Sequence, residues 1–343
     1  MPQKYPHARE LEPLGFAFGS SFRDWITADS LPKLAADAAL VTTPGTTVPV
    51  EFLAYIDPRV VEILTAPRKS REIFKEVKKG DWTTPYFKFR ATELTGGTEP
   101  YSDKAKNRTS GVNYDWQGRD NYLYQTVIEY GDLEQATTAA AKISLASDKQ
   151  RAAANILDLD GNRFNLLGIA GKSIYGLLNA PNLNAALTAA AVSTGESTTS
   201  TKWADKTTLQ IYQDLLDLFQ QLVTQANGWI DANTRLILAL PPALSVELGK
   251  PNEYGKTALG MIREYLPNLR LVTVPEMTAS SGNTMMLIAE EVMGNPVGEL
   301  GFSEKVRAGR VVPDLSSFSQ KWVAGTYGAI IYYPFAIATM KGM

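Results

Sequence analysis

The sequence lacks the residues on which several classes of enzyme and metal site depend. Its 343 residues include no cysteine and one histidine, His7. Without cysteine the chain forms no disulfide, no thiolate metal site and no cysteine nucleophile. One histidine is too few for a zinc site of the usual kind or for a histidine-based triad within this chain. We therefore expect no metal, no cofactor and no catalytic residues, and a protein that is not an enzyme.

The sequence also lacks a membrane segment and a strong charge of one sign. No stretch approaches the roughly 20 consecutive apolar residues of a spanning helix, and no signal-peptide-like run opens the chain. The formal net charge is −2, which gives the whole chain none of the basic character of a tight nucleic-acid binder. With 44% hydrophobic and 20% charged residues, we expect a folded protein of the cytoplasm with no membrane partner.

Short motifs of catalytic families are incomplete. Gly171-Lys172-Ser173 ends like a phosphate-binding loop, but Leu166 occupies the position that needs the first glycine. Glu290 and Glu291 are adjacent on an expected strand, so their side chains point to opposite faces and are poor partners for acid–base chemistry. An enzyme with an unrecognised site is an alternative.

A long helix is predicted from Asp132 to Leu159. Asp132 is placed to cap its N-terminus with Gln135 three residues later, and Gly161 is placed to end it. At about 1.5 Å per residue it would be roughly 40 Å long. The run is rich in alanine, with a thin apolar stripe of Leu133, Ile143, Leu145, Ile156 and Leu157. We expect a strut against which other segments pack closely; a long buried helix of an ordinary enzyme is the alternative.

Before this helix, two alternating segments predict a long β-ribbon. Residues Tyr86–Ala91 and Tyr122–Ile128 both have the period of a strand, and about thirty polar, turn-rich residues separate them. Such a ribbon has little core of its own and needs a partner surface in water. It therefore indicates assembly, although a lid of a single-chain enzyme has the same pattern.

After the helix, residues 204–295 alternate between helical and strand patterns. Thr207 and Gln210 form a capping box at the start of an amphipathic helix. Strands are expected at Leu236–Leu240, Leu269–Val274 and Thr284–Ala289, and we predict an α/β subdomain too small for a complete Rossmann enzyme domain. The tail from Val306 is expected to be rich in strands.

The first 48 residues are predicted to form an arm instead of a domain. Prolines interrupt them, yet aromatic side chains recur at Phe16, Phe18, Phe22 and Trp25. We expect these four aromatic residues to dock the arm on another surface, either a neighbouring subunit or the chain's own domain.

This order of parts resembles the major capsid proteins of tailed bacteriophages, with the Hong Kong 97-type fold. Three phrases carry the likeness locally: Gly176-Leu177-Leu178-Asn179, Val274-Pro275-Glu276 and the closing run Gly328–Ala338. The resemblance implies an α+β fold with an N-arm, an extended β-hairpin loop, a long spine helix, and peripheral and axial domains. The implied divisions are 1–48 for the arm, 49–81 for the start of the peripheral domain, 82–131 for the extended loop, 132–203 for the spine helix and peripheral domain, 204–295 for the axial domain, and 296–343 for a return to the peripheral domain.

The resemblance also implies a function. Hexamers and pentamers of this chain would tile an icosahedral shell around packaged double-stranded DNA, which needs no sequence-specific reader. The other partners implied are scaffolding, portal and decoration proteins, and the location is the virion, assembled in the bacterial cytoplasm. Lys104, Lys106 and Arg108 lie in the expected loop and are candidate inter-subunit contacts. Some relatives join subunits by a lysine–asparagine isopeptide bond, but no partner asparagine is identifiable here.

Two other assemblies are alternatives to this function. An encapsulin-type shell that stores cargo enzymes has the same fold, although its pattern is usually more compact. A tail or other virion structural protein shares the logic of assembly and would form tubes or rings.

Overall fold

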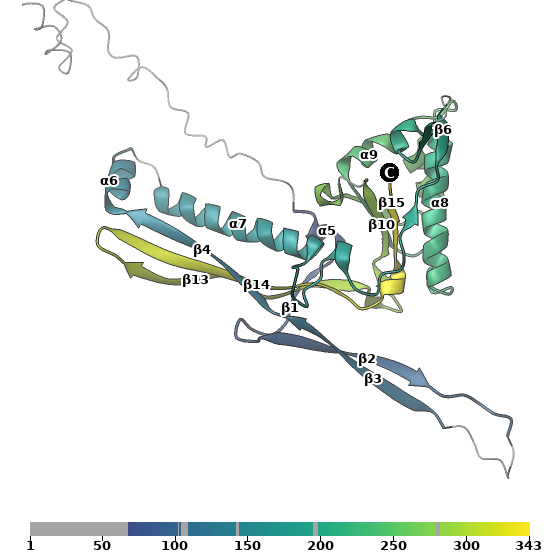
Figure 1. Cartoon of the computed structure of the whole chain (residues 1–343), viewed down its shortest axis with the longest axis horizontal. Coiled ribbons are helices and arrows are strands. Elements are labelled where there is room, and N and C mark those ends of the chain that lie inside the picture. Colours follow the sequence, from purple (N-terminus) through teal and green to yellow (C-terminus); the bar gives the residue numbers. More distant parts are fainter. Residues whose placement is uncertain (1–67, 102, 104–108, 142–143, 195–197, 279–281) are drawn as a thin grey trace, which may run out of the picture. The chain divides into compact units, whose positions relative to one another are not determined.

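A computed structural model describes residues 68–343, apart from residues 102, 104–108, 142–143, 195–197 and 279–281. The described strands form two principal sheets, one of five strands and one of four, and three two-stranded sheets. The architecture is therefore α+β, as the sequence predicts (Figure 1).

The five-stranded sheet collects segments from distant parts of the chain. Its order is β5 (Leu187–Thr188), β15 (Ile337–Lys341), β10 (Thr284–Ala289), β8 (Leu236–Leu240) and β9 (Leu269–Thr273). β10 is antiparallel to both β15 and β8, whereas β8 and β9 are parallel. The three strands predicted for this region are confirmed within a residue at their ends.

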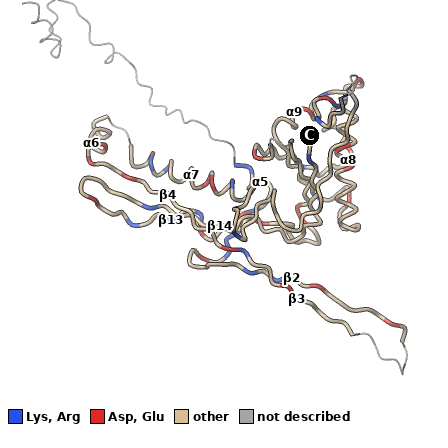
Figure 2. Tube along the Cα trace, viewed as in Figure 1, with Lys and Arg blue, Asp and Glu red and all other residues tan. Residues whose placement is uncertain are grey.

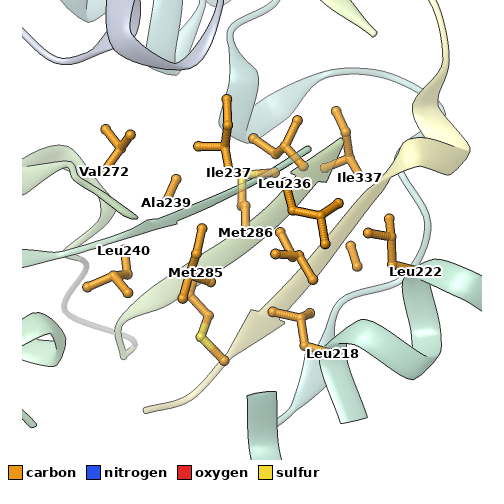
Figure 3. Packing of buried hydrophobic residues seen from close by; sticks show 14 of the residues in the cluster. Leu218, Leu222, Leu236, Ile237, Ala239, Leu240, Val272, Met285, Met286 and Ile337 are labelled. Carbon is orange, nitrogen blue, oxygen red and sulfur yellow. The ribbon is translucent and has the colours of Figure 1, made fainter. Parts of the chain in front are cut away.

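Helix α8 (Thr208–Gln225) supplies the main cover of this sheet. Its predicted capping box is present: the Thr207 hydroxyl accepts from the Gln210 amide at 3.4 Å, and the Thr207 amide donates to Gln210 Oε1 at 2.8 Å. Figure 3 shows Leu218 and Leu222 of α8 on the side of the sheet where Met285 lies. All three side chains are fully buried, so this layer is the core of the α/β region.

Shorter elements surround the sheet. Pro241-Pro242 precede α9 (Pro242–Glu247), where proline suits the first helical position, and Thr257 caps α10 (Ala258–Tyr265) by accepting from the Gly260 amide. The remaining small elements are the turns η3 (Leu177–Asn179), η4 (Trp203–Asp205), η5 (Pro275–Met277) and η6 (Pro334–Ala336), and the strands β6 (Val192–Thr194), β7 (Thr198–Ser200), β11 (Glu291–Val292) and β12 (Asn295–Pro296).

The four-stranded sheet is built on the longest strands of the described chain. Its order is β1 (Glu76–Lys78), β13 (Gly298–Pro313), β14 (Ser317–Ile331) and β4 (Tyr122–Gly131). β13 and β14 form a long hairpin, and β4 pairs with β14 along ten residues. Figure 1 shows helix α7 (Leu145–Leu167) running alongside β4 and β14, which it contacts.

The single long helix predicted from Asp132 to Leu159 is wrong. Two helices, α6 (Asp132–Ala140) and α7, replace it, with Gly131 and Ser144 at their N-caps. No residue of α6 is buried, so packing does not extend the helix. Thr137 and Thr138 also donate their hydroxyls to carbonyls one turn back, which favours bending and fraying. The expected apolar stripe fails as well, because Leu133 and Ile156 are exposed and only Leu157 of the five is buried among the described residues.

The predicted end of the helix at Gly161 is also wrong, because α7 continues to Leu167 and Gly168 ends it with φ 68°. Asn162, Asn165 and Leu166 are buried in this last stretch, and their packing outweighs the cost of a helical glycine, about 1 kcal/mol. A Cβ added to Gly161 would lie 2.8 Å from Tyr124 Oη. Gly161 therefore lets β4 approach the helix closely, and burial beneath the helix raises the pKa of Tyr124.

Two expected strand assignments need correction. Tyr122–Ile128 was predicted to pair with Tyr86–Ala91, but it belongs to β4, which pairs with β14 in the four-stranded sheet. The strand that pairs with Tyr86–Ala91 is β3 (Gly111–Asp120). The tail was expected to return as a whole to one domain, but β15 joins the five-stranded sheet. Alternation of apolar and polar residues predicts a strand, but it does not tell whether the strand pairs with its neighbour in sequence or with a distant segment. The short helix α5 (Ser70–Ile73) leads into β1.

Gly328 is expected to be intolerant of any side chain. It adopts φ 74°, and an added Cβ would lie 2.4 Å from the Tyr175 carbonyl oxygen, which accepts from the Ala329 amide at 2.8 Å. An alanine here would be strained by the left-handed backbone conformation, and its Cβ would also overlap the Tyr175 carbonyl. Together these two costs should make Gly328→Ala lower the free energy of unfolding by about 3 kcal/mol. Chemical denaturation of the unassembled protein measures this loss.

Gly171→Ala is the matched control for that substitution. Gly171 has φ 78° but no atom within 4 Å of an added Cβ. It should therefore lose only the conformational part, about 1 kcal/mol. Equal losses for the two variants would contradict the assigned clash at Gly328.

Candidate assembly surfaces

Most residues of the β2–β3 hairpin are exposed. β2 (Tyr86–Thr95) and β3 (Gly111–Asp120) pair along ten residues and make no ladder with another strand. Ten residues per strand make the ribbon about 30 Å long. Two-stranded sheets of this kind are marginal in water without a supporting surface, so most of the hairpin requires a partner outside the described residues.

The two faces of the hairpin differ sharply. Paired residues of an antiparallel ladder share a face, so the even-numbered residues of both strands form one surface, which we call the aromatic face. Its members with large side chains are Tyr86, Lys88, Arg90, Leu94, Val112, Tyr114 and Trp116. Tyr114 is 58% exposed, Trp116 62% and Leu94 82%. Exposed apolar residues gathered on one face mark an interaction surface.

The opposite face of the hairpin is polar away from the base. Glu93, Asn113 and Asp115 lie on it, and the Asn113 amide donates to Glu93 Oε2 at 3.3 Å. At the base the same face carries Phe87 and Phe89 instead. Because only the aromatic face is apolar along its whole length, it is the face that we expect a partner surface to cover.

Aromatic contacts attach the base of the hairpin to the end of β14. The ring of Phe87 lies 6.0 Å from Tyr327, and the ring of Phe89 meets Tyr332 edge-on at 5.5 Å. Asn121, just beyond β3, accepts from the Ser303 hydroxyl at 2.9 Å and donates to the Thr84 carbonyl at 2.9 Å. The base is therefore fixed to the four-stranded sheet while the rest of the ribbon is exposed.

Arg119 lies at the centre of this attachment. Its guanidinium carbon is 5.6 Å from the centre of the Phe89 ring and 4.9 Å from that of Tyr175. Only 6% of the residue is exposed, its Nε has no hydrogen-bond partner, and Nη1 donates to the Gly118 carbonyl at 3.0 Å. Burial lowers the pKa of Arg119. Two ring faces, instead of a carboxylate, compensate this buried cation.

Arg119→Ala should loosen the base of the hairpin without unfolding the protein. Losing contact with both rings removes about 1–3 kcal/mol, partly offset because a desolvated cation is also removed. Amide hydrogen exchange of the unassembled protein should accelerate roughly tenfold at Phe87 to Phe89. Lys88→Ala, on the opposite face, serves as the control and should leave these amides unchanged. Equal acceleration in both variants would contradict the role given to Arg119.

None of the candidate contact and docking residues predicted from the sequence lies in the described part of the chain. Lys104, Lys106 and Arg108, predicted as inter-subunit contacts, and Phe16, Phe18, Phe22 and Trp25, predicted to dock the arm, all fall outside it. They stay predictions. Sequence reasoning missed Tyr114 and Trp116 because glycine and polar residues surround them, although their spacing of two was a usable signal.

The charged residues under α7 neutralise one another. A cavity of about 330 Å³ between α7 and the sheet is lined by Glu76 and Asp158, and the Arg71 side chain binds both. Arg68 also pairs with Asp158 at 2.6 Å, and Lys305 with Glu76 at 2.6 Å. This network holds α7 to β1 and β13. Figure 2 shows both signs of charge spread along these elements.

Within residues 68–343, outside the undescribed gaps, no group of three or more potential ligands is placed to hold a metal ion. In the same part of the chain, no helix has both the length and the apolar character to cross a membrane.

Comparison with known proteins identifies the family. A model of the Pa193 gp26 major capsid protein family matches residues 39–342, which is most of the chain. The chain belongs to this major capsid protein family. A search of curated proteins finds no match.

Solved structures show that this major capsid protein has the Hong Kong 97-type fold of tailed phages. The capsid of Myoviridae phage XM1 is similar with a TM-score of 0.71 and 12% identity, covering 87% of this chain and 100% of that one. The capsid of a native GTA particle gives 0.58 and 10%, covering 84% and 94%. Mycobacterium phage Che8 gives 0.53 and 10%, covering 86% and 97%. At these identities the likeness shows the fold alone.

The family and the fold agree with the resemblance found in the sequence. Both are structural and not enzymatic, and a major capsid protein is a component of the virion that assembles with itself into a shell.

Proposed function

We propose that this major capsid protein assembles as hexamers and pentamers into a closed icosahedral shell around packaged double-stranded DNA. The observation that carries the proposal is the aromatic face, whose five large apolar side chains are between 43% and 82% exposed. A surface of this kind is unfavourable in a free subunit and stabilising once covered. Many modest contacts of this type, repeated in every subunit, hold a shell by multivalency.

The shell is proposed to enclose the DNA without recognising its sequence. A formal net charge of −2 is compatible with this role, because packaging needs no base contacts. Further proposed partners are a separate scaffolding protein, a portal and decoration proteins, with assembly in the bacterial cytoplasm. The arm of residues 1–48 and the loop lysines Lys104 and Lys106 are proposed to contact neighbouring subunits.

Assembly of the chain expressed alone tests the proposal. After size-exclusion chromatography, negative-stain electron microscopy should show closed shells or five- and six-fold rings, and added scaffolding protein should convert rings into shells. A monomer or dimer that never assembles, even with scaffold at high concentration, would overturn it.

The contents of the particles separate the alternatives. Nuclease-protected double-stranded DNA in particles from phage-producing cells supports the capsid function. Particles filled with one co-purifying enzyme would instead favour an encapsulin-type shell, and tubes would favour a tail-type virion protein.

A further inference from the structure

Asn162 connects three parts of the described chain through its side chain. The residue lies near the end of α7 and is only 4% exposed. Its Oδ1 accepts from the Ser70 amide at 3.0 Å, and its Nδ2 donates to Glu276 Oε1 at 2.7 Å. Ser70 begins α5, which contacts α7 (Figure 1) and leads to the four-stranded sheet, whereas Glu276 lies in η5, after β9 of the five-stranded sheet. We call these three residues the Asn162 junction.

The chemistry of the junction fixes the orientation of the Asn162 amide. A carboxylate only accepts hydrogen bonds and a backbone N–H only donates one, so the amide satisfies both partners with Nδ2 toward Glu276 and Oδ1 toward Ser70. Hydrogen bonds to a charged acceptor are among the stronger ones in proteins. Glu276 depends on this bond, because its other oxygen, Oε2, is buried and has no hydrogen-bond partner among the described residues.

The backbone around Glu276 is fixed to the five-stranded sheet. Glu276 is the last residue of Val274-Pro275-Glu276, one of the phrases that carry the family likeness in the sequence. Val274 is fully buried, and its amide donates to the Leu240 carbonyl at the end of β8 at 2.8 Å. The ring of Pro275 restricts φ at its position, and Met277, the residue after Glu276, is also buried. Glu276 therefore moves with the sheet.

Unfilled space lies on both sides of the junction. Asn162 lines the cavity of about 330 Å³ beneath α7, and Glu276 and Leu167 line a second cavity of about 700 Å³. Leu166 packs in the buried core and keeps the end of α7 attached to the sheet. Such apolar contacts have no preferred direction, whereas a hydrogen bond does. The junction therefore contributes what the packing lacks, a fixed orientation of the end of α7 on the five-stranded sheet.

This orientation matters in a shell built from many copies. Each copy contributes both sheets, and closure of a ring or shell depends on the rotation from one copy to the next. A small change between the two sheets, repeated in every copy, changes the curvature of the whole shell.

We propose that the Asn162 junction holds the five-stranded sheet in one orientation relative to α7 and the four-stranded sheet, so that the assembled shells have one size. This inference rests on the proposed function and assigns Asn162 and Glu276 as positioning residues. Without the junction, copies with different orientations enter the same shell, and its curvature varies.

Asn162→Asp tests the junction by removing the donor and placing two carboxylates against each other, while an oxygen remains to accept from the Ser70 amide. In the unassembled protein, amide hydrogen exchange at Met277 should accelerate at least about tenfold. Negative-stain microscopy of the assembled variant should show a broad distribution of particle diameters, where the wild type gives one diameter. Glu276→Ala, which removes the acceptor without adding a charge, should give the same two results.

Asn162→Asp combined with Glu276→Gln reverses the direction of the hydrogen bond. The new amide at position 276 then donates to the new carboxylate at position 162, which still accepts from Ser70. This double variant should return both the exchange rate at Met277 and the particle diameter to near the wild-type values. A general loss of stability would show no such recovery.

Asn155→Asp is the matched control. It makes the same chemical change at an exposed position of the same helix, where the side-chain oxygen accepts from Arg68 at 3.2 Å and is retained in the variant. It should leave the exchange rate at Met277 and the particle diameter unchanged.

Three outcomes would overturn the role of the junction. These are uniform shells of wild-type diameter from both Asn162→Asp and Glu276→Ala, no recovery in the double variant, and equal broadening of the diameters by Asn155→Asp. Failure of the wild-type chain to assemble would instead contradict the proposed function, and the exchange rates of the unassembled variants distinguish the two failures. Circular dichroism of each unassembled variant confirms that it is folded.

Discussion

Asp214→Ala should be among the most destabilising single substitutions in the described chain, at about 3–5 kcal/mol. Asp214 Oδ2 accepts from Lys206 Nζ at 2.5 Å and from Trp203 Nε1 at 2.8 Å. The Lys206 and Asp214 side chains are 0% and 2% exposed. Removing the carboxylate leaves a buried ammonium and a buried indole N–H without partners. The thermal midpoint of the unassembled protein should fall by roughly 10 °C.

The apolar double variant Lys206→Met/Asp214→Leu separates the cost of an orphaned charge from the value of the pair. Buried ion pairs are often replaceable by apolar residues, so it should recover more than half of the loss. Lys256→Ala, which breaks the exposed pair with Glu264 at 3.1 Å, should change stability by under about 0.5 kcal/mol. A loss in Asp214→Ala as small as in Lys256→Ala would contradict the burial of this network.

Trp116→Asp should prevent shell assembly while leaving the subunit folded. Trp116 is 62% exposed in the single chain, so its replacement costs the isolated subunit at most about 0.5 kcal/mol. In a covered interface a central tryptophan is worth about 2 kcal/mol or more, which is roughly a thirtyfold change in the affinity of each contact. The loss recurs in every subunit. Sedimentation velocity should show unassembled subunits at concentrations where the wild type forms particles.

Asn113→Asp is the matched control on the other face of the same hairpin. It introduces the same charge at an exposed position of β3, beside Glu93, and should assemble at nearly the wild-type concentration. Assembly of Trp116→Asp at that concentration would contradict the assignment of the aromatic face as an interface.

Local signals predicted the α/β region well. A capping box marks the start of the helix that follows Thr207, and Leu236–Leu240 is a fully buried apolar strand. Pro241-Pro242 mark the start of α9, and Pro275 follows the end of β9. Each of these boundaries depends on residues within one or two turns of the chain, so the sequence contains the necessary information.

Long-range partners were not predictable in the same way. The alternation of Tyr122–Ile128 is real, but the strand pairs with residues about 195 positions later along the chain. Gly161 reads as a helix end until the approach of Tyr124 is known. The break after Ala140 depends on α6 having no buried face, which is a tertiary property. The aromatic face emerges only once the register of β2 and β3 places Tyr114, Trp116 and Leu94 on one side.

The proposed shell and the role of the aromatic face are tested together by a symmetric cryo-electron microscopy reconstruction of particles assembled from this chain. We expect a closed shell with five- and six-fold capsomers in which Tyr114 and Trp116 are buried against a neighbouring copy. A closed shell in which the aromatic face remains open to solvent would contradict the role assigned to the hairpin, and tubes without five-fold vertices would contradict the icosahedral shell.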